Sequence, residues 1–138
     1  MKKTVFSTPL GWAGAGIVEK GICRIVLPRG SRKTVKGELA SVKREMLKAA
    51  ASRSVDRAII KTVKRLQQYF SGRRVSFDLP LDLSYYTPFQ RAVWKTAAAI
   101  PYGETRSYAW IAKRIGRPKA ARAVGQALGA NPVPILIP

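Results

Sequence analysis

The sequence contains no histidine and one cysteine, and each shortage excludes a class of site. Without histidine the 138 residues offer no imidazole for acid–base catalysis, and we expect neither a zinc site nor another cofactor. Cys23 alone cannot form an internal disulfide, which favours a reducing, cytoplasmic setting. No apolar run approaches the roughly 18 residues of a membrane span. The basic N-terminus lacks the sustained apolar stretch of a signal peptide.

Acidic residues are also scarce, since 26 Lys and Arg face seven Asp and Glu for a net charge of +19. Such a field attracts polyanions, and nucleic acid is the usual one. The alternative is a ribosome-like or merely basic protein, because charge alone specifies neither sequence nor chemistry. Hydrophobic residues make up 46% of the chain, which suits one domain or a domain with a small companion.

The first 83 residues read as short strands followed by a helix. Segments 3–9 and 21–28 predict strands, and Leu10-Gly11 predicts a turn. Residues 29–55 have weak periodicity and are expected to be partly loop. Fourteen Lys and Arg lie between residues 29 and 74. Residues 56–70 predict a helix that Asp56 caps and Ser71-Gly72 ends, with an inward stripe of Ile59, Val63, Leu66 and Phe70. Residues 76–83 predict an extended edge or connector, because Pro80 cannot donate a ladder hydrogen bond.

Residues 84–138 predict three helices. Thr87 caps the first, with Pro88 at its first position and an inward stripe of Phe89, Val93, Ala97 and Ile100. Ser107 caps the second, which Gly116 closes and in which one face carries Tyr108, Ile111, Ala112 and Ile115. Pro118 is expected to open the third, which runs to about Gly129 with Ala121, Val124 and Leu128 inward. Two short helices joined by a tight glycine-containing turn indicate a helix-turn-helix, and the whole chain reads as α+β.

The third helix has the composition of a nucleic-acid reader. Its sequence KAARAVGQALG consists mostly of small residues, from which Arg122 projects as a long cation. Small residues allow a backbone to approach a groove wall closely, and a projecting arginine can then enter a base stack. The alternative is that alanine and glycine simply let two helices pack closely and that Arg122 is a solvated charge.

The segment from Thr87 to Pro138 closely resembles the C-terminal domain of the O6-alkylguanine-DNA alkyltransferases, the methylated-DNA–protein-cysteine methyltransferases. The resemblance runs through IPYGETRSY, RPKAARAVG and NPVPILIP, in that order and without a gap. Segments STPLG and LDLSYYTPFQ resemble the family's first strand pair and its linker more loosely. The resemblance implies a ribonuclease-H-like domain over 1–83 and an incomplete, winged-helix-like DNA-binding domain over 84–138.

The resemblance also implies a role for particular residues. Arg122 would enter the duplex from the minor-groove side and fill the space of the extruded base, while Tyr108 presses on the neighbouring phosphate. Ala120, Ala121 and Gly125 would line the helix face against the groove. An O6-alkyl group lies inside the stack, so the base must be flipped out at a cost of about a few kcal/mol.

Two more residues would support the chemistry. Asn131 would cap the turn before the active-site strand, and Pro134 would form a wall of the alkylguanine pocket. In the family the alkyl group of O6-alkylguanine passes to a cysteine thiolate in a Pro-Cys-His-Arg-Val motif, and the protein is consumed; O4-alkylthymine is the further candidate substrate. Double-stranded DNA is then the partner, and we expect a cytoplasmic, nucleoid-associated monomer.

The nucleophile of that motif would follow Pro138, so the 138 residues hold no catalytic residue and are expected to be inactive. Cys23 lies in a predicted strand without histidine and is interpreted as a buried structural thiol. Four explanations stay open for the missing residue: an arbitrary sequence boundary, a nonsense mutation at a cysteine codon, a non-catalytic lesion binder, and a TGA codon read as selenocysteine. The alternative functions are a lesion-binding protein without catalysis and a generic basic helix-turn-helix module.

Overall fold

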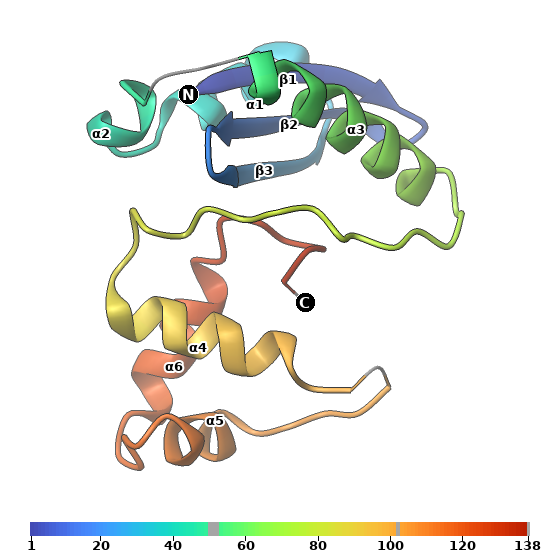
Figure 1. Cartoon of the computed structure of the whole chain (residues 1–138). Helices are drawn as coiled ribbons and strands as arrows, with labels where there is room; N and C mark the ends of the chain where they lie inside the picture. Colours follow the sequence, from blue (N-terminus) through green and yellow to red (C-terminus); the bar gives the residue numbers. More distant parts are fainter. Residues whose placement is uncertain (50–52, 102, 138) are drawn as a thin grey trace. The chain divides into compact units, whose positions relative to one another are not determined.

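The computed structural model describes residues 1–49, 53–101 and 103–137, and the chain forms two compact units, residues 1–85 and 86–138. Among the described residues, the first unit holds a three-stranded antiparallel sheet and three helices, and the second holds three helices (Figure 1). The predicted α+β class is confirmed. Among the described helices, none is long and apolar enough to cross a membrane.

The sheet of the first unit has the order β1-β2-β3, with β1 at Lys2–Thr8, β2 at Gly11–Val18 and β3 at Gly21–Arg29. The central strand β2 consists mostly of glycine and alanine, and for that reason its pattern gave no strand prediction. Its small residues have a packing role: a Cβ at Gly14 would lie 2.6 Å from the Val35 side chain. Glycine therefore lets a helix approach this face of the sheet closely.

That helix is α1, Arg32–Ala40, which a short helix α2, Arg44–Leu47, follows. The prediction of a partly looped segment over 29–55 missed both. Ser31 caps α1 by accepting a hydrogen bond from the Thr34 N–H at 3.1 Å. Only Val35 and Leu39 are buried, and two apolar positions give too weak a periodicity to identify a helix from sequence.

Helix α3, Arg53–Phe70, begins three residues before the predicted start. Asp56 therefore lies in the first turn and is not the cap, and its carboxylate pairs with Lys2. Leu66 is buried, and the rest of the predicted stripe is half-buried. The helix ends as predicted, because Gly72 adopts φ 85° and the Arg73 N–H donates to the Gln68 carbonyl at 3.1 Å.

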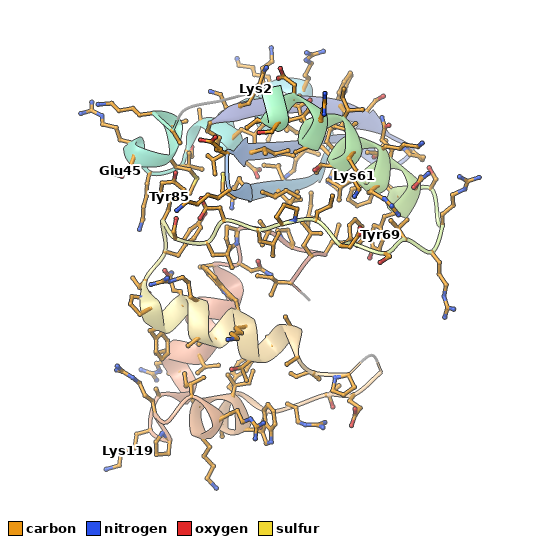
Figure 2. The ribbon with its side chains drawn as sticks, viewed as in Figure 1. Lys2, Glu45, Lys61, Tyr69, Tyr85 and Lys119 are labelled. Carbon is orange, nitrogen blue, oxygen red and sulfur yellow. The ribbon has the colours of Figure 1, made fainter. Side chains whose placement is uncertain are left out.

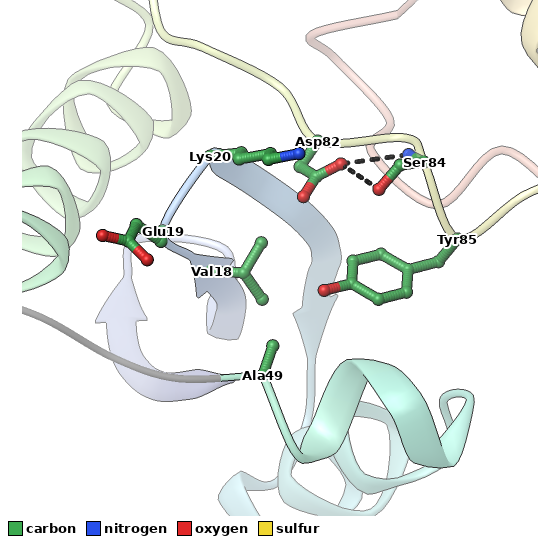
Figure 3. A pocket seen from close by; sticks show the side chains of 7 residues that line it. All are labelled: Val18, Glu19, Lys20, Ala49, Asp82, Ser84 and Tyr85. Atoms are coloured by element: carbon green, nitrogen blue, oxygen red, sulfur yellow. Dashed lines mark hydrogen bonds between the residues drawn. The ribbon is translucent and has the colours of Figure 1, made fainter.

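After α3 the chain runs along the edge of the sheet as the predicted extended connector. The Ile22 N–H donates to the Pro80 carbonyl at 2.8 Å, and the Asp82 N–H donates to the Ile22 carbonyl at 2.8 Å. Proline serves there only as an acceptor, as its missing N–H requires. The buried Asp82 carboxylate then accepts hydrogen bonds from the N–H and hydroxyl of Ser84, beside a hollow of about 230 Å³ into which Tyr85 points (Figure 3).

The second unit consists of α4, Pro88–Ala98, α5, Tyr108–Arg114, and α6, Ala121–Gly129. The predicted cap of α4 is confirmed and is reciprocal: the Gln90 N–H donates to Thr87 Oγ1, and the Thr87 N–H donates to Gln90 Oε1. Ser107 caps α5 as predicted, accepting from the Trp110 N–H at 3.0 Å. Tyr102, predicted to help end the first helix, lies outside the described residues.

The turn between α5 and α6 has the geometry of a Schellman motif. Gly116 adopts φ 81°, its N–H donates to the Lys113 carbonyl at 3.1 Å, and the Arg117 N–H donates to the Ala112 carbonyl at 2.8 Å. The predicted start of the third helix at Pro118 is wrong. Residues 118–120 complete the turn, and Ala120 is the N-cap of α6. The helix-turn-helix itself is confirmed.

Candidate nucleic-acid interface

A buried tryptophan fixes α6 against α4. Trp94 is fully buried, its Nε1–H donates to the Ala127 carbonyl at 2.8 Å, and its ring meets Tyr86 edge-on at a centroid distance of 5.1 Å. Val93 and Val124 are also fully buried. Because a buried indole N–H needs a partner, this hydrogen bond sets the rotation of α6 about its axis and therefore which face of α6 is exposed.

Tyr108 opens α5 and lies against α6. The sequence pattern placed it on the inward face with Ile111, but its side chain is 53% exposed whereas Ile111 is buried. A first-turn side chain points back past the helix start, so it leaves the core stripe. The ring covers the backbone of α6 at Gly125, where an added Cβ would lie 2.9 Å from Tyr108 Cε2. Glycine at this position is what allows the phenol to rest on α6.

Arg122 lies one turn before Gly125 on α6 and is exposed. Positions three residues apart share a helix face, so the guanidinium and the Tyr108 ring border the same stretch of α6. Throughout the described part of the chain, no hydrogen bond or ion pair engages the Arg122 side chain. Ala120 and Ala121 are half-buried and add only methyl groups. The predicted DNA-binding residues thus lie on α6, at its N-cap or against it, and Arg122 is the long cation among them.

The segment after α6 folds back as a tight turn. Asn131 holds both ends of it, since its Nδ2 donates to the Ile137 carbonyl at 2.7 Å and its Oδ1 accepts from the Val133 N–H at 3.0 Å. Ile135 has φ 77°, a left-handed conformation that is rare for a β-branched residue. This segment is a turn with one parallel bridge between Pro134 and Ile137. Pro134 is half-buried within it.

Trp110 adds a feature that the sequence reading did not select. Arg106 and Arg114 both lie over its ring, at 5.3 Å and 5.9 Å from the centroid, and the ring is 37% exposed. The spacing of Arg106, Trp110 and Arg114, each four residues apart, was the available signal. An aromatic face between two cations suits a phosphate and sugar surface.

The charge of this unit is almost entirely of one sign. Its eight basic side chains are all exposed, namely Arg91, Lys95, Arg106, Lys113, Arg114, Arg117, Lys119 and Arg122. Its one acid, Glu104, pairs with Arg106 at 3.1 Å. A surface of this kind fits a polyanion such as nucleic acid.

The structure supplies no nucleophile from Cys23. The side chain is fully buried on β3, and its Sγ lies 3.4 Å from the Gly16 carbonyl. Burial, followed by the charge of Asp82, raises the pKa of the Cys23 thiol to about 12. A neutral buried thiol is inert. Within residues 1–49, 53–101 and 103–137, no group of three or more His, Cys, Asp or Glu side chains is placed to hold a metal ion.

Comparison with known proteins gives matches over both units. Residues 1–83 match the family described as 6-O-methylguanine DNA methyltransferase, ribonuclease-like domain, and residues 88–138 match 6-O-methylguanine DNA methyltransferase, DNA binding domain. The constitutive methylated-DNA–protein-cysteine methyltransferase of Bacillus subtilis is 55% identical over 75 residues, which are 54% of this chain and 45% of the relative. The Mycolicibacterium paratuberculosis relative is 52% identical over 82 residues, 59% of this chain and 49% of its own.

Solved structures agree in fold. The chain is similar to Mycobacterium tuberculosis OGT in complex with DNA, with a TM-score of 0.67 and 35% identity over 99% of this chain and 74% of that one. It is also similar to the O6-methylguanine methyltransferase of the same organism, with a TM-score of 0.61 and 36% identity over 97% of this chain and 73% of that one. The chain spans about half the length of the curated relatives that it matches.

Proposed function

The chain belongs to the 6-O-methylguanine DNA methyltransferase family, and on that premise we propose that it acts in the direct repair of O6-alkylguanine in double-stranded DNA. The observation that carries the proposal is the surface of α6, where the unengaged Arg122 lies one turn from Gly125 and the Tyr108 ring. A surface without side-chain bulk can approach a groove, and one long cation can replace a base in the stack.

The steps follow from that surface. Exposed cations bind the phosphates, and α6 enters the minor groove along Ala120, Ala121 and Gly125. Tyr108 presses on the phosphate beside the lesion while Arg122 occupies the space that the rotated base leaves. Flipping a normally paired base out of the duplex costs about a few kcal/mol. An alkylated guanine pairs poorly, so flipping it out costs less, and this difference gives selectivity for the lesion.

Alkyl transfer is a single displacement. The nucleophile attacks the alkyl carbon, the carbon–oxygen bond breaks, and the electron pair returns to the guanine, which takes up a proton. We propose that the nucleophile is the residue that follows Pro138, with Pro134 in the pocket wall and Asn131 holding the turn that presents it. O4-alkylthymine offers the same bond in a smaller base and is a second substrate. No cofactor is needed, because the alkyl group stays on the protein as a thioether or selenoether and the nucleophile is not regenerated.

The 138-residue polypeptide itself is expected to bind lesions without repairing them, because it holds one thiol, Cys23, whose pKa burial raises to about 12. The second candidate function is a non-catalytic lesion-binding protein. Incubation with a duplex that carries radiolabelled O6-methylguanine separates the two. Label transfer to the polypeptide would contradict the expectation, whereas transfer only to a product extended past codon 138 supports repair.

The DNA downstream of codon 138 identifies the nucleophile. An in-frame His-Arg-Val after a cysteine codon indicates the thiol enzyme, and the same motif after TGA indicates selenocysteine. Absence of the motif rules out both and leaves the lesion-binding function. We further propose that the protein works as a monomer in the cytoplasm, held on the nucleoid by its DNA partner.

Replacing Arg122 by alanine tests the base-replacing role. The variant should lose most of the preference for alkylated over plain duplex while its affinity for plain duplex falls only slightly. Lys119→Ala, which removes an exposed cation just before α6, is the matched control and should weaken both duplexes alike. Equal losses from the two variants would reduce Arg122 to a phosphate contact.

A further inference from the structure

Most of the positive charge lies outside the helix-turn-helix unit. Residues 1–85 carry 18 Lys and Arg against six Asp and Glu, a net charge of +12, while residues 86–138 carry eight against one, a net charge of +7. The proposed base-flipping surface uses only the second unit. The larger share of the charge therefore has no role in the steps described so far.

Part of that charge forms a regular row on α3. Arg57, Lys61 and Lys64 are exposed and follow one another at spacings of four and three residues, so they share one face of the helix. The opposite face is buried at Val55 and Leu66. The row therefore points away from the sheet; Figure 2 labels Lys61 midway along α3.

Among the described residues, no acid forms an ion pair with this row. Asp56, the one acidic residue of α3, pairs with Lys2. Across the part of the chain that the structure describes, Arg57, Lys61 and Lys64 have neither an ion pair nor a hydrogen bond to another side chain. Three cations within two turns repel one another, and an isolated helix is destabilised by such pairs. A bound polyanion removes that repulsion.

The dimensions fit a phosphate backbone. Seven residues of helix at about 1.5 Å per residue place Arg57 and Lys64 about 10 Å apart along the axis. Four successive phosphates of one strand span about the same length, as three rises of roughly 3.4 Å each. A membrane surface fits less well, because an interfacial helix needs an apolar face to insert. The apolar face of α3 lies on the sheet, and Ile60, 69% exposed, is the one large aliphatic side chain left outside.

We propose that Arg57, Lys61 and Lys64 of α3 form a second DNA-binding surface, which contacts the phosphate backbone of duplex DNA and takes no part in lesion recognition. The inference rests on the proposed function, since it assumes that duplex DNA is the partner. It gives the N-terminal unit a role in DNA affinity, while lesion preference stays with Arg122. The two roles are separable because phosphate contacts are independent of sequence and of lesion.

The test is the salt dependence of binding by the 138-residue chain to plain and O6-methylguanine duplexes between 50 and 200 mM salt, roughly the range in which such contacts are lost. Replacing Arg57, Lys61 and Lys64 together by glutamine should lower the slope of log K against log salt by about two to three, at about 0.9 per phosphate. Affinity for both duplexes should fall by the same factor, so that their ratio is unchanged.

A variant with Lys33, Lys36 and Lys48 replaced by glutamine is the matched control. It removes the same charge from exposed sites of the same unit, outside α3. Its slope should change by less than one, and a change equal to that of the α3 variant overturns the proposal in favour of a diffuse field. An unchanged slope in the α3 variant also overturns the proposal, and the three cations of α3 would then suit an acidic protein partner instead.

Two further measurements separate a folding defect from a lost DNA contact, and a failure of this inference from a failure of the proposed repair function. If the triple variant melts early, Lys61→Gln alone should lower the slope by about one, and no change would refute the inference. If the wild-type chain shows no lesion preference, the proposed repair function fails, yet a slope that falls only in the α3 variant still supports the second surface.

Discussion

Replacing Gly125 by alanine is the sharpest perturbation of the α6 surface. The new Cβ would lie 2.9 Å from Cε2 and 3.1 Å from Cδ2 of Tyr108, where ordinary contacts are 3.4–4 Å. The ring therefore has to move by at least about half an ångström or leave α6 altogether, and it can leave because it is 53% exposed. The backbone of α6 does not have to move.

Stability and binding should then separate. Alanine in place of glycine inside a helix stabilises it by about 1 kcal/mol, which offsets the lost contact with the ring, so the free energy of unfolding should change by about 1 kcal/mol or less. Binding depends on where the phenol points. A hydrogen bond to a charged group contributes about 1.5–3 kcal/mol, so loss of the Tyr108–phosphate contact should weaken binding to the alkylated duplex by roughly 10- to 150-fold.

Gly129→Ala is the matched control, because nothing lies within 4 Å of the Cβ it would add and it lies at the end of the same helix. Fluorescence anisotropy with a labelled O6-methylguanine duplex measures affinity, and a thermal melt measures stability. If the Gly125 variant is folded and binds like the Gly129 variant, Tyr108 does not need its place on α6 and the proposed role is wrong.

Two more predictions concern the turn after α6 and the single thiol. Asn131→Ala removes the hydrogen bonds to the Ile137 carbonyl and from the Val133 N–H, so urea denaturation should show a loss of about 1–3 kcal/mol; an unchanged midpoint would contradict this. Burial and the charge of Asp82 raise the pKa of Cys23 from 9.0 to about 12, so only the unfolded thiol ionises between those values. The free energy of unfolding should therefore fall as pH rises from about 9 to 12, and Cys23→Ala should lack that part of the fall.

Local signals in the sequence predicted the helix ends that depend on one or two residues. The caps at Thr87 and Ser107 and the left-handed stop at Gly116 are all present, because each is decided by side chains within three residues of the helix end. The sheet-edge connector around Pro80 was predictable for the same reason: a missing N–H limits where the residue can pair.

Tertiary packing decided the features that the sequence did not reveal. Strand β2 lacks apolar alternation because Gly14 has to admit α1, and a sequence window contains no information about that helix. Pro118 suits a helix start, but residues 117–120 form a turn that the Ala120 N–H closes on the Arg117 carbonyl, and α6 begins at Ala121. The apolar run before Pro138 bends because Asn131 bonds across it, a contact six residues apart that periodicity does not register.

The burial of Cys23 has a practical consequence for experiments in solution. Probe chemistry on a protein usually begins by removing its native cysteines, at the risk of new cavities. Here the sole thiol of the 138 residues lies fully buried in the sheet and is protonated at neutral pH, so it is silent towards maleimides while the chain stays folded. A cysteine introduced on the surface at Glu45 or Ala98, both exposed, becomes the one site that takes a fluorophore or a spin label. Spectroscopy on otherwise unaltered 138-residue chains can then follow each unit separately as DNA binds.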